Sequence, residues 1–536
     1  MNWIRTLMPF DRLAPFAVAA ATSMMLALPA AAQDTPKRGG VVTAVVNPDP
    51  AFLVTAHNPI GGALDVSSKL FEGLAYYDLD MKLQPALATS WEVSEDGLTM
   101  TFHLREGVKW HDGVPFTSKD VAFTLEKIWK VMHPRNRVVM SKVESVETPD
   151  DLTVILHLSS PAPYLLAVIN GNESQVVPQH IYDGEDVGAR LVSERPVGTG
   201  PFRLKEWRKG EAIILEANPD YWQEGKPYLD GMIYRVITDE AARAAAFETG
   251  EVQYGVFGPV SPCTAQRLAS IEHLGVETKG YQFFGSRYIM EVNTRRPELS
   301  DRRVRQAIAH AVDVDFILDN VFCGYGVKST GPVPVELTEF YTPDVPSYPY
   351  DPAAAEKLLD EAGYPRGADG IRFKIFHDPL PFGASYTRAA EVVKQNLQDV
   401  GIAVEIRMQD TPTWLTRIYT DYDFDLTSNT PSALPDPTLG IQRVYWSKNI
   451  IKGAPFSNGS GYSNPEMDEV LEAAANEPDQ EKRKELFNRM QVIAQTDLPV
   501  IDLFVIQRTT IYDKKLHNHT MQADGYTNFA DAWLEE

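Results

Sequence analysis

Residues 90–113 read SWEVSEDGLTMTFHLREGVKWHDG, and this stretch guides the interpretation of the rest of the chain. The Asp96-Gly97 step is typical of a tight turn, and apolar and polar residues alternate in the eight positions that follow. A period of two predicts a half-buried strand with one apolar face. Further on, Thr117 and Asp120 form a helix-capping pattern ahead of apolar residues at helical spacing. The stretch therefore predicts a meander of strands that ends in a helix.

The order of residues from Trp91 to Gly113 resembles the signature of family 5 extracellular solute-binding proteins. The pattern W-E-x-S-x-D-G-x-T-x-T-F-x-L-R-x-G-V-K-W-H-D-G runs through it without a gap. Members of that family are the peptide-, nickel-, opine- and glycoside-binding subunits of bacterial ABC importers. The resemblance implies an α/β, two-lobed periplasmic binding protein fold of type II, with an extra inserted subdomain and a ligand cleft between the lobes. It identifies a scaffold and leaves the ligand open.

The resemblance and the pattern of elements together divide the chain into parts. We expect the core of lobe I at residues 33–75, 197–285 and 500–536, an inserted subdomain at residues 76–196, and lobe II at residues 286–499. Strands alternate with capped helices through the expected lobe II, which argues for helices packed on a sheet. The apolar segment 498–504 is expected to form a final strand that returns the chain to lobe I.

The N-terminus has the pattern of a cleaved export signal. Arg5 and Arg12 precede a nearly unbroken apolar run from Leu13 to Leu28, and Ala30-Ala31-Ala32 then offers a cleavage site. A membrane anchor is the alternative, because the run approaches the length that spans a bilayer. The small residues at its end and the polar residues after it favour cleavage after Ala32. The sequence therefore predicts a signal peptide at residues 1–32 and a periplasmic product.

Composition and charge set broad limits on the partners. The chain has 536 residues, of which 44% are hydrophobic and 23% charged, so it can bury a sizeable core. Its formal net charge of −23 argues against nucleic acid or an anionic membrane surface as a partner. The two cysteines, Cys263 and Cys323, are either a disulfide or two unpaired thiols, and sequence alone does not decide between these.

No known catalytic or metal-binding motif stands out in the sequence. It contains no Gly-x-Ser-x-Gly elbow, no His-Glu-x-x-His and no paired Cys-x-x-Cys. His517 and His519 are the closest histidine pair, and their polar surroundings favour a solvated pair over a metal site. We therefore expect binding without catalysis, with no cofactor and no metal.

Candidate ligand contacts come from aromatic and polar residues in two parts of the chain. In the resembled family, the segment after the first strand lines one wall of the cleft, and Phe52 and His57 fall in it. Aromatic residues are dense from Trp414 to Trp446, and they surround a loop rich in turn-forming residues, where ligand contacts concentrate. The candidate ligand-binding residues are Phe52, His57, Arg388, Trp414, Asn429, Ser432, Asp436, Tyr445 and Trp446.

The sequence departs from its peptide-binding relatives at one position. In those relatives, an aspartate shortly before an Asp-Pro pair holds the amino terminus of the peptide. The matching place here is Ala433, and a buried ammonium without a counter-charge is costly. The ordinary peptide-binding mode would then require Asp436 to take over. Arg388 lies where such relatives have basic residues near the ligand carboxylate, and it fits an exposed helix position equally well.

These observations predict a periplasmic receptor that closes its lobes on a solute and presents it to an ABC permease. A peptide or peptide-like ligand is the first expectation, and an opine, a glycoside or another small organic solute is the second. Nickel and haem rank lower because no histidine cluster is present. The alternatives of another class are an exported hydrolase and a sensor or chemotaxis accessory. The expected partners are the permease subunits, and the protein itself is expected to be a monomer.

Overall fold

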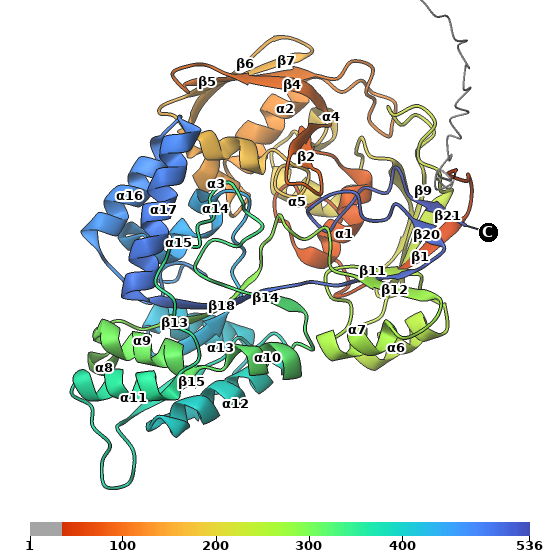
Figure 1. Ribbon diagram of the computed structural model, residues 1–536. Helices are drawn as coiled ribbons and strands as arrows, with labels where there is room; N and C mark the ends of the chain where they lie inside the picture. The colour runs from red at the N-terminus through yellow and green to blue at the C-terminus, as the bar shows by residue number, and fades with distance from the viewer. Residues whose placement is uncertain (1–34, 536) are drawn as a thin grey trace, which may run out of the picture. The chain divides into compact units, whose positions relative to one another are not determined.

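The computed structural model describes residues 35–535, so the expected signal peptide lies outside the described residues. Residues from Lys37 onward form one compact unit, and the description below concerns that unit. It contains two large sheets, a four-stranded sheet and two strand pairs (Figure 1). We use "lobe I" for residues 37–285 and 507–535, and "lobe II" for residues 286–506.

Lobe I is built on a seven-stranded sheet that collects distant parts of the chain. Its strands are β1 (Val41–Val46), β8 (Phe202–Arg208), β9 (Ala212–Ala217), β10 (Gly231–Val236), β11 (Tyr254–Gly255), β12 (Leu274–Glu277) and β19 (Thr510–Asp513). Their order is β12-β19-β11-β1-β10-β9-β8. The apolar strand β1 runs parallel to both β10 and β11, and the remaining pairs are antiparallel.

Three helices pack on this sheet, and two small strand pairs complete lobe I. The helices are α1 (Gly61–Leu70), α6 (Glu240–Glu248) and α7 (Pro262–Leu268). The strand pairs are β2 (Ala75–Tyr77) with β3 (Leu83–Pro85), and β20 (Leu516–His517) with β21 (Trp533–Leu534). In Figure 1, α6 and α7 lie beside β11 and β12.

The stretch that opened the sequence analysis forms the outer four-stranded sheet of lobe I. Its strands are β4 (Ala88–Val93), β5 (Thr99–Leu104), β7 (Thr153–Leu158) and β6 (Val143–Asp150), in that order. Met100, Phe102 and Leu104 point into the core, as the alternation predicts. Leu98 does not take part, because it lies in the turn before β5 and is 36% exposed.

The predicted helix follows this sheet and begins where the capping pattern places it. Helix α2 (Ser118–Thr124) starts after Thr117, whose backbone N–H donates to the Asp120 carboxylate over 2.9 Å. It continues as the wider π-helical turn η1 (Leu125–Trp129). The remaining helical segments here are short: α3 (Asn136–Val139), η2 (Met140–Lys142), η3 (Pro163–Val168), α4 (Gln179–Tyr182) and α5 (Val187–Ser193).

Lobe II is built on a six-stranded mixed sheet. Its strands are β14 (Gly326–Lys328), β18 (Val500–Ile506), β13 (Arg287–Val292), β17 (Leu426–Asn429), β15 (Phe373–Asp378) and β16 (Ile402–Ile406), in that order. Its helical segments are α8 (Pro297–Ser300), α9 (Arg302–Ala311), α10 (Val314–Asn320), α11 (Pro352–Glu361), α12 (Ala384–Asp399), α13 (Thr411–Thr416), η4 (Arg417–Asp421), α14 (Pro437–Gly440), α15 (Gln442–Tyr445), η5 (Ser447–Asn449), α16 (Pro465–Asn476) and α17 (Gln480–Asp497).

Strand β13 separates two apolar cores because its side chains alternate between the faces of the sheet. Met290 packs with side chains of α9 and α12 on one face. Ile289 packs with side chains of α15, α16 and α17 on the other. Lobe II is therefore a sheet covered by helices on both faces, as the alternation of strands and helices predicts.

The final strand of the sequence analysis belongs to a different sheet from the one expected. Strand β18 pairs with β13 and β14 in lobe II, and the chain enters the seven-stranded sheet only at β19. Residues 500–506 therefore lie with lobe II and not with lobe I. The apolar run predicts a buried strand correctly, but such a run fits either sheet equally well, because burial does not identify the pairing partner.

Two chain segments cross between the lobes, residues 278–286 and 507–509. A disulfide adds a third covalent link, since Cys263 of α7 in lobe I is bonded to Cys323 of lobe II. The link lies beside the second crossing, where the Gln507 N–H donates to the Tyr325 carbonyl over 3.3 Å. The alternative that the sequence left open is thus resolved in favour of the disulfide.

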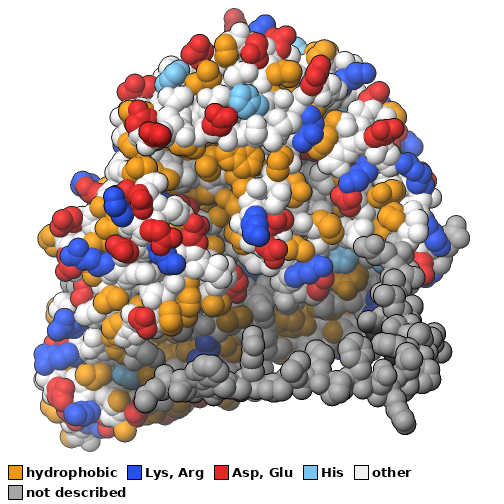
Figure 2. Space-filling model, turned by 45° about the horizontal axis from the view of Figure 1, so that its top comes forward, with side chains coloured by type: hydrophobic (Ala, Val, Ile, Leu, Met, Phe, Trp, Pro, Cys, Tyr) orange, Lys and Arg blue, Asp and Glu red, His pale blue; other side chains and the backbone are white. Residues whose placement is uncertain are grey.

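Acidic and basic side chains are interspersed over the face seen in Figure 2.

Candidate functional site

A pocket of about 500 Å³ lies between the two lobes. We call it the interlobe pocket. Lobe I contributes Tyr77, Met100 and Leu166, among others, and lobe II contributes Phe340, Asp436 and Arg483. Concave sites between domains are common places for small ligands to bind.

Asp436, one of the candidate ligand contacts, borders this pocket but already has a partner. Its carboxylate is 5% exposed and accepts from both terminal nitrogens of Arg483, with one of the two bonds at 2.7 Å. The same carboxylate caps α14 by accepting from the Thr438 N–H over 2.9 Å. Its charge is therefore balanced within lobe II, and a ligand ammonium would have to compete with a buried guanidinium.

A second set of polar side chains comprises one group in each lobe, and an electrostatic effect links the two groups. We call this set the interlobe polar cluster. Its members are His57, His133, Arg135, Asn136 and Glu173 from lobe I, and Glu291, Tyr419, Asn429 and Arg443 from lobe II. Electrostatic effects on pKa connect its members. The Glu173 carboxylate and the Arg135 guanidinium both act on the pKa of His133, and the Arg135 charge acts on that of Arg443 across the lobes.

The lobe I half of the cluster is organised around the start of α3. Arg135 forms an ion pair with Glu173, and the Asn136 Nδ2 donates to the Glu173 carbonyl over 2.7 Å. His133 Nδ1 accepts from the Asn136 N–H over 2.9 Å. Burial, as the main cause, lowers the pKa of His133 to about 4, so its ring is neutral at physiological pH. The Oε2 of Glu173 and the Nε2 of His133 are buried and have no hydrogen-bond partner among residues 35–535.

The lobe II half is organised around Glu291 on β13. Its Oε1 accepts from the Asn429 Nδ2 over 2.9 Å and from the Tyr419 hydroxyl over 3.2 Å. Its Oε2 is buried without a partner. Burial raises the pKa of Glu291, while the bonds from Asn429 and Tyr419 act in the opposite direction. Burial also lowers the pKa of the nearby Arg443 to about 10, and the Arg135 charge adds to this effect.

The candidate residues Asn429 and His57 belong to this cluster. The ring of Phe52 lies 4.7 Å from that of His57 and is buried beside it. The two parts of the chain singled out from the sequence, the segment after β1 and the segment after Trp414, therefore each contribute a residue to the polar cluster. Whether these side chains contact a ligand stays a prediction.

Four other candidates lie elsewhere in lobe II. Trp414 is fully buried in the core, and its Nε1 donates to the Asp378 carbonyl over 3.2 Å. Tyr445 is also fully buried, in the second core of the lobe. The Nε1 of Trp446 donates to Glu472 of α16 over 3.0 Å, and Arg388 is exposed on α12.

Ser432 and Ala433 lie where the loop meets the crossing segment between the lobes. Ser432 is half-buried and forms a β-bridge with Ser286. Ala433 is fully buried, and its N–H donates to the Phe284 carbonyl over 2.9 Å. A small packed side chain therefore stands at Ala433, close to where the resemblance predicts the aspartate of the peptide binders.

The sequence analysis missed Arg135, Glu173, Glu291 and Arg443. Glu291 had a detectable signal, because it is an acidic residue among the apolar residues of β13, a strand that is buried throughout, and a buried charge requires partners. The other three lie in short helices or loops, where a charged residue is ordinary.

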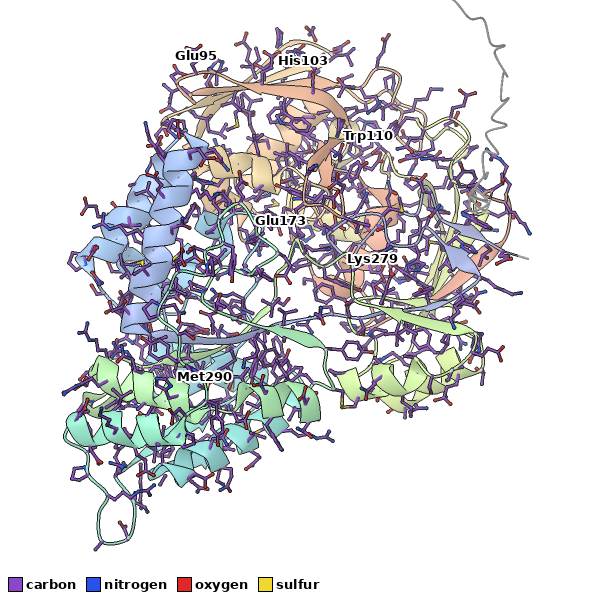
Figure 3. All side chains as sticks on the ribbon, in the orientation of Figure 1. Glu95, His103, Trp110, Glu173, Lys279 and Met290 are labelled. Atoms are coloured by element: carbon purple, nitrogen blue, oxygen red, sulfur yellow. A yellow bond between two sulfur atoms is a disulfide. The ribbon has the colours of Figure 1, made fainter. Side chains whose placement is uncertain are left out.

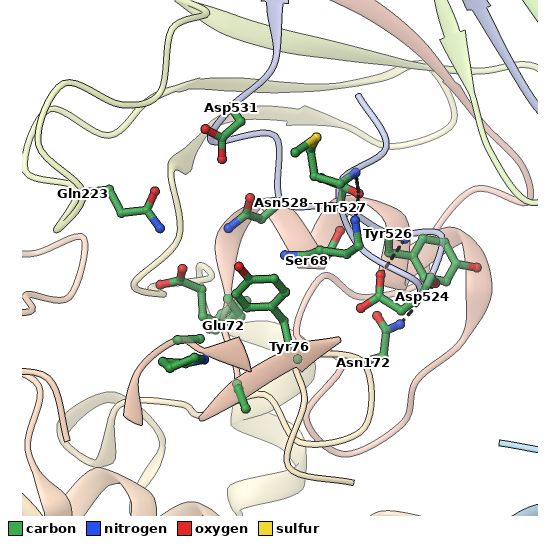
Figure 4. A pocket seen from close by; sticks show the side chains of 18 of the residues that line it. Ser68, Glu72, Tyr76, Asn172, Gln223, Asp524, Tyr526, Thr527, Asn528 and Asp531 are labelled. Atoms are coloured by element: carbon green, nitrogen blue, oxygen red, sulfur yellow. Dashed lines mark hydrogen bonds between the residues drawn. The ribbon is translucent and has the colours of Figure 1, made fainter. Parts of the chain in front are cut away.

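A smaller pocket of about 120 Å³ lies within lobe I (Figure 4). Glu72 and Asp524 line it together with Asn172, Thr527 and Asn528. Glu72 accepts from the Trp222 Nε1 over 3.0 Å, and burial raises the pKa of Asp524 to about 6. None of the candidate residues from the sequence lines this pocket.

Within residues 35–535, no group of three or more histidine, cysteine, aspartate or glutamate side chains is placed to hold a metal ion. In the same part of the chain, no helix combines the length and the apolar character that crossing a membrane requires.

Residues 82–451 match the profile of the bacterial extracellular solute-binding proteins, family 5. The chain belongs to this family. The resemblance seen between Trp91 and Gly113 therefore extends over most of the sequence, and the two-lobed α/β fold is the one that the resemblance implied.

Individual relatives of this family 5 solute-binding protein agree with that assignment. The chain is 29% identical over 493 residues to the glutathione-binding protein GsiB of Pectobacterium atrosepticum, covering 88% of this chain and 90% of that one. Among solved structures, it is similar to the ABC transporter substrate-binding protein CtaP of Listeria monocytogenes, with a TM-score of 0.81 and 25% identity, covering 93% and 100% of the two chains.

A second solved structure is the periplasmic binding protein DppA of Helicobacter pylori in complex with the peptide STSA. The TM-score is 0.76 with 26% identity, and the match covers 93% of this chain and 99% of that one. These relatives are described as solute-binding proteins and not as enzymes.

Proposed function

We propose that this family 5 protein is the substrate-binding subunit of a bacterial ABC importer that traps a peptide or peptide-like solute between its lobes. The observation that carries the proposal is the interlobe pocket of about 500 Å³, which is lined by side chains of both lobes, among them Tyr77 and Met100 of lobe I and Phe340 of lobe II. A concave site between two domains is a common place for a small ligand to bind, and a hinge motion of the lobes would close it around the solute. The relatives that bind glutathione and the peptide STSA support this ligand class.

Export to the periplasm is part of the proposal. The N-terminal pattern of residues 1–32 predicts a cleaved signal, and a disulfide persists in an oxidising compartment. We also propose that the protein acts as a monomer, that it docks on permease subunits in the closed form, and that it releases its ligand unaltered. The division into lobe I, an inserted subdomain and lobe II belongs to the same proposal.

Ligand screening by thermal shift tests the proposal. The mature chain is titrated with di- to tetrapeptides, glutathione, opines and oligosaccharides. A ligand at 100 times its Kd should stabilise the protein by about 2.7 kcal/mol, which shifts the melting temperature measurably. Small-angle X-ray scattering of the best binder should then show a smaller radius of gyration, and mass spectrometry should recover the ligand intact. The absence of a shift with every compound would refute the proposal, and chemical turnover would refute its binding-only part.

A further inference from the structure

The smaller pocket, of about 120 Å³, lies within lobe I, and we call it the lobe I pocket. Segments that are distant along the chain meet there: the end of α1, the loops at residues 171–172 and 222–223, and the C-terminal segment 521–531 (Figure 4). It shares no lining residue with the interlobe pocket. Figure 3 labels Glu95, which borders the interlobe pocket, at the outer sheet of lobe I. The lobe I pocket is therefore a separate concavity that the proposed function does not use.

The walls of the lobe I pocket carry acidic side chains and no basic ones. Glu72, Asp524 and Asp531 line it, whereas no lysine, arginine or histidine among residues 35–535 does so. Lys226 forms an ion pair with Asp531 over 2.5 Å, so the charge of that carboxylate is balanced. Within the described chain, Glu72 and Asp524 have no basic nitrogen within 4.0 Å. The pocket therefore favours an occupant with a positive charge.

Asp524 presents an unpartnered oxygen to this pocket. Its side chain is 3% exposed, and its Oδ1 accepts from the Tyr526 N–H over 3.0 Å. No hydrogen bond from residues 35–535 reaches its Oδ2, and in Figure 4 the carboxylate points into the pocket. The ammonium of Lys69 instead donates to Asp65 over 3.2 Å and to Ser68 over 3.0 Å. A buried carboxylate oxygen without a donor is costly, so this one requires a donor from water or from a ligand.

Glu72 contributes charge to the pocket but no free acceptor. Its Oε1 accepts from the Tyr221 hydroxyl over 2.8 Å. Its Oε2 accepts from the Trp222 Nε1 over 3.0 Å and from the Thr199 hydroxyl over 2.9 Å. These neutral donors hold the carboxylate in place and favour its ionised form without cancelling its charge. Glu72 therefore attracts a cation from the wall, whereas Asp524 offers the oxygen that a cation can contact.

The rest of the lining suits an organic cation better than a metal ion. The rings of Tyr76 and Tyr526 border the pocket, and an aromatic ring attracts a cation that lies over its face. Three side-chain amides supply further acceptors, those of Asn172, Gln223 and Asn528. No group of three or more metal-ligating side chains among the described residues is placed to hold a metal ion. Since a cavity of about 150 Å³ admits benzene, this pocket has room for a molecule of a few non-hydrogen atoms.

We propose that the lobe I pocket binds a small organic cation with a primary ammonium group, which donates to the Oδ2 of Asp524. An ammonium has three N–H donors, so it can also reach the amide oxygens while its alkyl part packs on Tyr76. A neutral solute of the same size would leave the negative charge of the pocket unbalanced. A potassium ion would balance charge but bring no hydrogen-bond donor. The proposal goes beyond the proposed function, because it assigns a second site with its own lining residues.

The experiment titrates the mature chain with probes of similar size and different charge. Isothermal titration calorimetry measures Kd for ethylammonium, for the neutral isostere ethanol and for potassium. The buffer is sodium phosphate at pH 7.5, which contains no competing amine. The proteins are the wild type, Asp524→Asn, Tyr76→Leu and the control Asp220→Asn. Asp220 is exposed and lies two positions before Trp222, outside the pocket lining.

We expect the wild type and the control to bind ethylammonium about 10-fold or more tightly than ethanol or potassium. Asp524→Asn removes the charge of the free oxygen and should weaken ethylammonium binding about 10-fold or more. Tyr76→Leu removes an aromatic face and should weaken it about 3-fold.

Failure of the wild type to bind ethylammonium overturns the proposal and leaves a pocket that holds water only. Binding of ethanol or potassium as tight as that of ethylammonium overturns it too, because the ammonium group then contributes nothing. Unchanged ethylammonium binding by Asp524→Asn also overturns it. If that variant does not fold, unchanged binding by Tyr76→Leu has the same meaning. None of these results bears on the proposed function, which rests on the interlobe pocket.

Discussion

Single residues in the cleft region show how burial changes what a charge can do. Asp436 and Arg483 form a buried, doubly bonded pair, whereas Arg443 has no such partner among the described residues. The first arrangement is complete within the protein, and the second leaves N–H donors of the guanidinium for other partners. A residue type alone does not distinguish these cases, because only the surroundings decide whether the charge is satisfied.

Removal of Arg483 should destabilise the protein strongly. Arg483→Met leaves the Asp436 carboxylate buried without its counter-charge, and we expect a loss of about 3–5 kcal/mol in the free energy of unfolding by urea denaturation. Arg489→Met is the matched control on the same helix, because its ion pair with Glu466 is exposed. The control should lose less than about 1 kcal/mol. Equal losses in the two variants would contradict the role given to the buried pair.

Acid should destabilise lobe II through His377. This ring is fully buried, and burial lowers its pKa from 6.5 to about 4. Below pH 6.5 the His377 ring therefore binds a proton in the unfolded chain but stays neutral in the folded chain. The free energy of unfolding falls as the pH drops from about 6.5 towards 4. By this linkage His377 accounts for a loss of about 2 kcal/mol between pH 7.5 and pH 5.

The variant His377→Gln isolates this effect from the other titrating groups. Its stability relative to the wild type should improve by about 2 kcal/mol between pH 7.5 and pH 5, as measured by chemical denaturation at each pH. His157→Gln is the control, because the side chain of His157 is 43% exposed. A constant difference between His377→Gln and the wild type across this range would show that His377 does not govern the acid response.

At the residue level, the sequence could pick out some residues of the polar cluster. Asn429 and His57 were candidates and belong to the polar cluster, whereas Trp414 and Tyr445 were candidates and lie in the cores of lobe II. The high density of aromatic residues from Trp414 to Trp446 therefore indicated packing in the core more than a wall of the cleft. Arg443 gave no signal in the sequence, since the electrostatic effect of Arg135 on it joins segments that are distant along the chain.

Elements follow local sequence signals closely where a cap is present. Helix α16 begins at Pro465 directly after Asn464, and α11 begins at Pro352 after Asp351, as the proline and cap pattern predicts. The strands of the outer sheet likewise follow their period of two. The pairing of β18 did not follow from local signals, because the partner of a buried strand is fixed by long-range packing.

The start of α2 offers a test at this scale. Besides capping the helix, Asp120 accepts from the Gln179 N–H over 2.8 Å and from the Trp110 Nε1 over 3.3 Å. Asp120→Ala removes the capping carboxylate and leaves these donors without an acceptor. We therefore expect a loss of about 2–4 kcal/mol in the free energy of unfolding, measured by thermal or urea denaturation.

Asp186→Ala, at the exposed N-cap of α5, is the control for this variant. It removes a single capping bond, which runs from the Ala189 N–H over 2.9 Å, and should lose about 1 kcal/mol. If Asp120→Ala loses no more than this control, the additional bonds of Asp120 contribute nothing measurable.

The whole molecule combines two lobes whose connections are few. The family resemblance predicted the two-lobed fold from the segment 91–113, and the family match over residues 82–451 confirms it. The covalent link from Cys263 to Cys323 did not follow from the sequence, because the two cysteines are separated by 60 positions and belong to different lobes.

Loss of this link should lower the stability of the whole molecule. In the chain-entropy description, a cross-link over 60 positions contributes about 4 kcal/mol by restricting the unfolded chain. The double variant Cys263→Ser/Cys323→Ser should therefore unfold at a lower urea concentration than the wild type. Wild-type protein unfolded under reducing conditions should match the variant. Unchanged midpoints in both would contradict this expectation.

The bond between Cys263 and Cys323 also affects how the receptor moves. With two peptide crossings and one sulfur bridge beside them, the joint between the lobes has three points of attachment. Such a connection permits a hinge motion but resists translation and twisting of one lobe against the other. The same surfaces should therefore meet in each closure of the lobes. A single proteolytic nick in either crossing would leave both halves tethered and aligned. The disulfide should therefore keep the geometry of the closed cleft constant over repeated cycles of ligand binding.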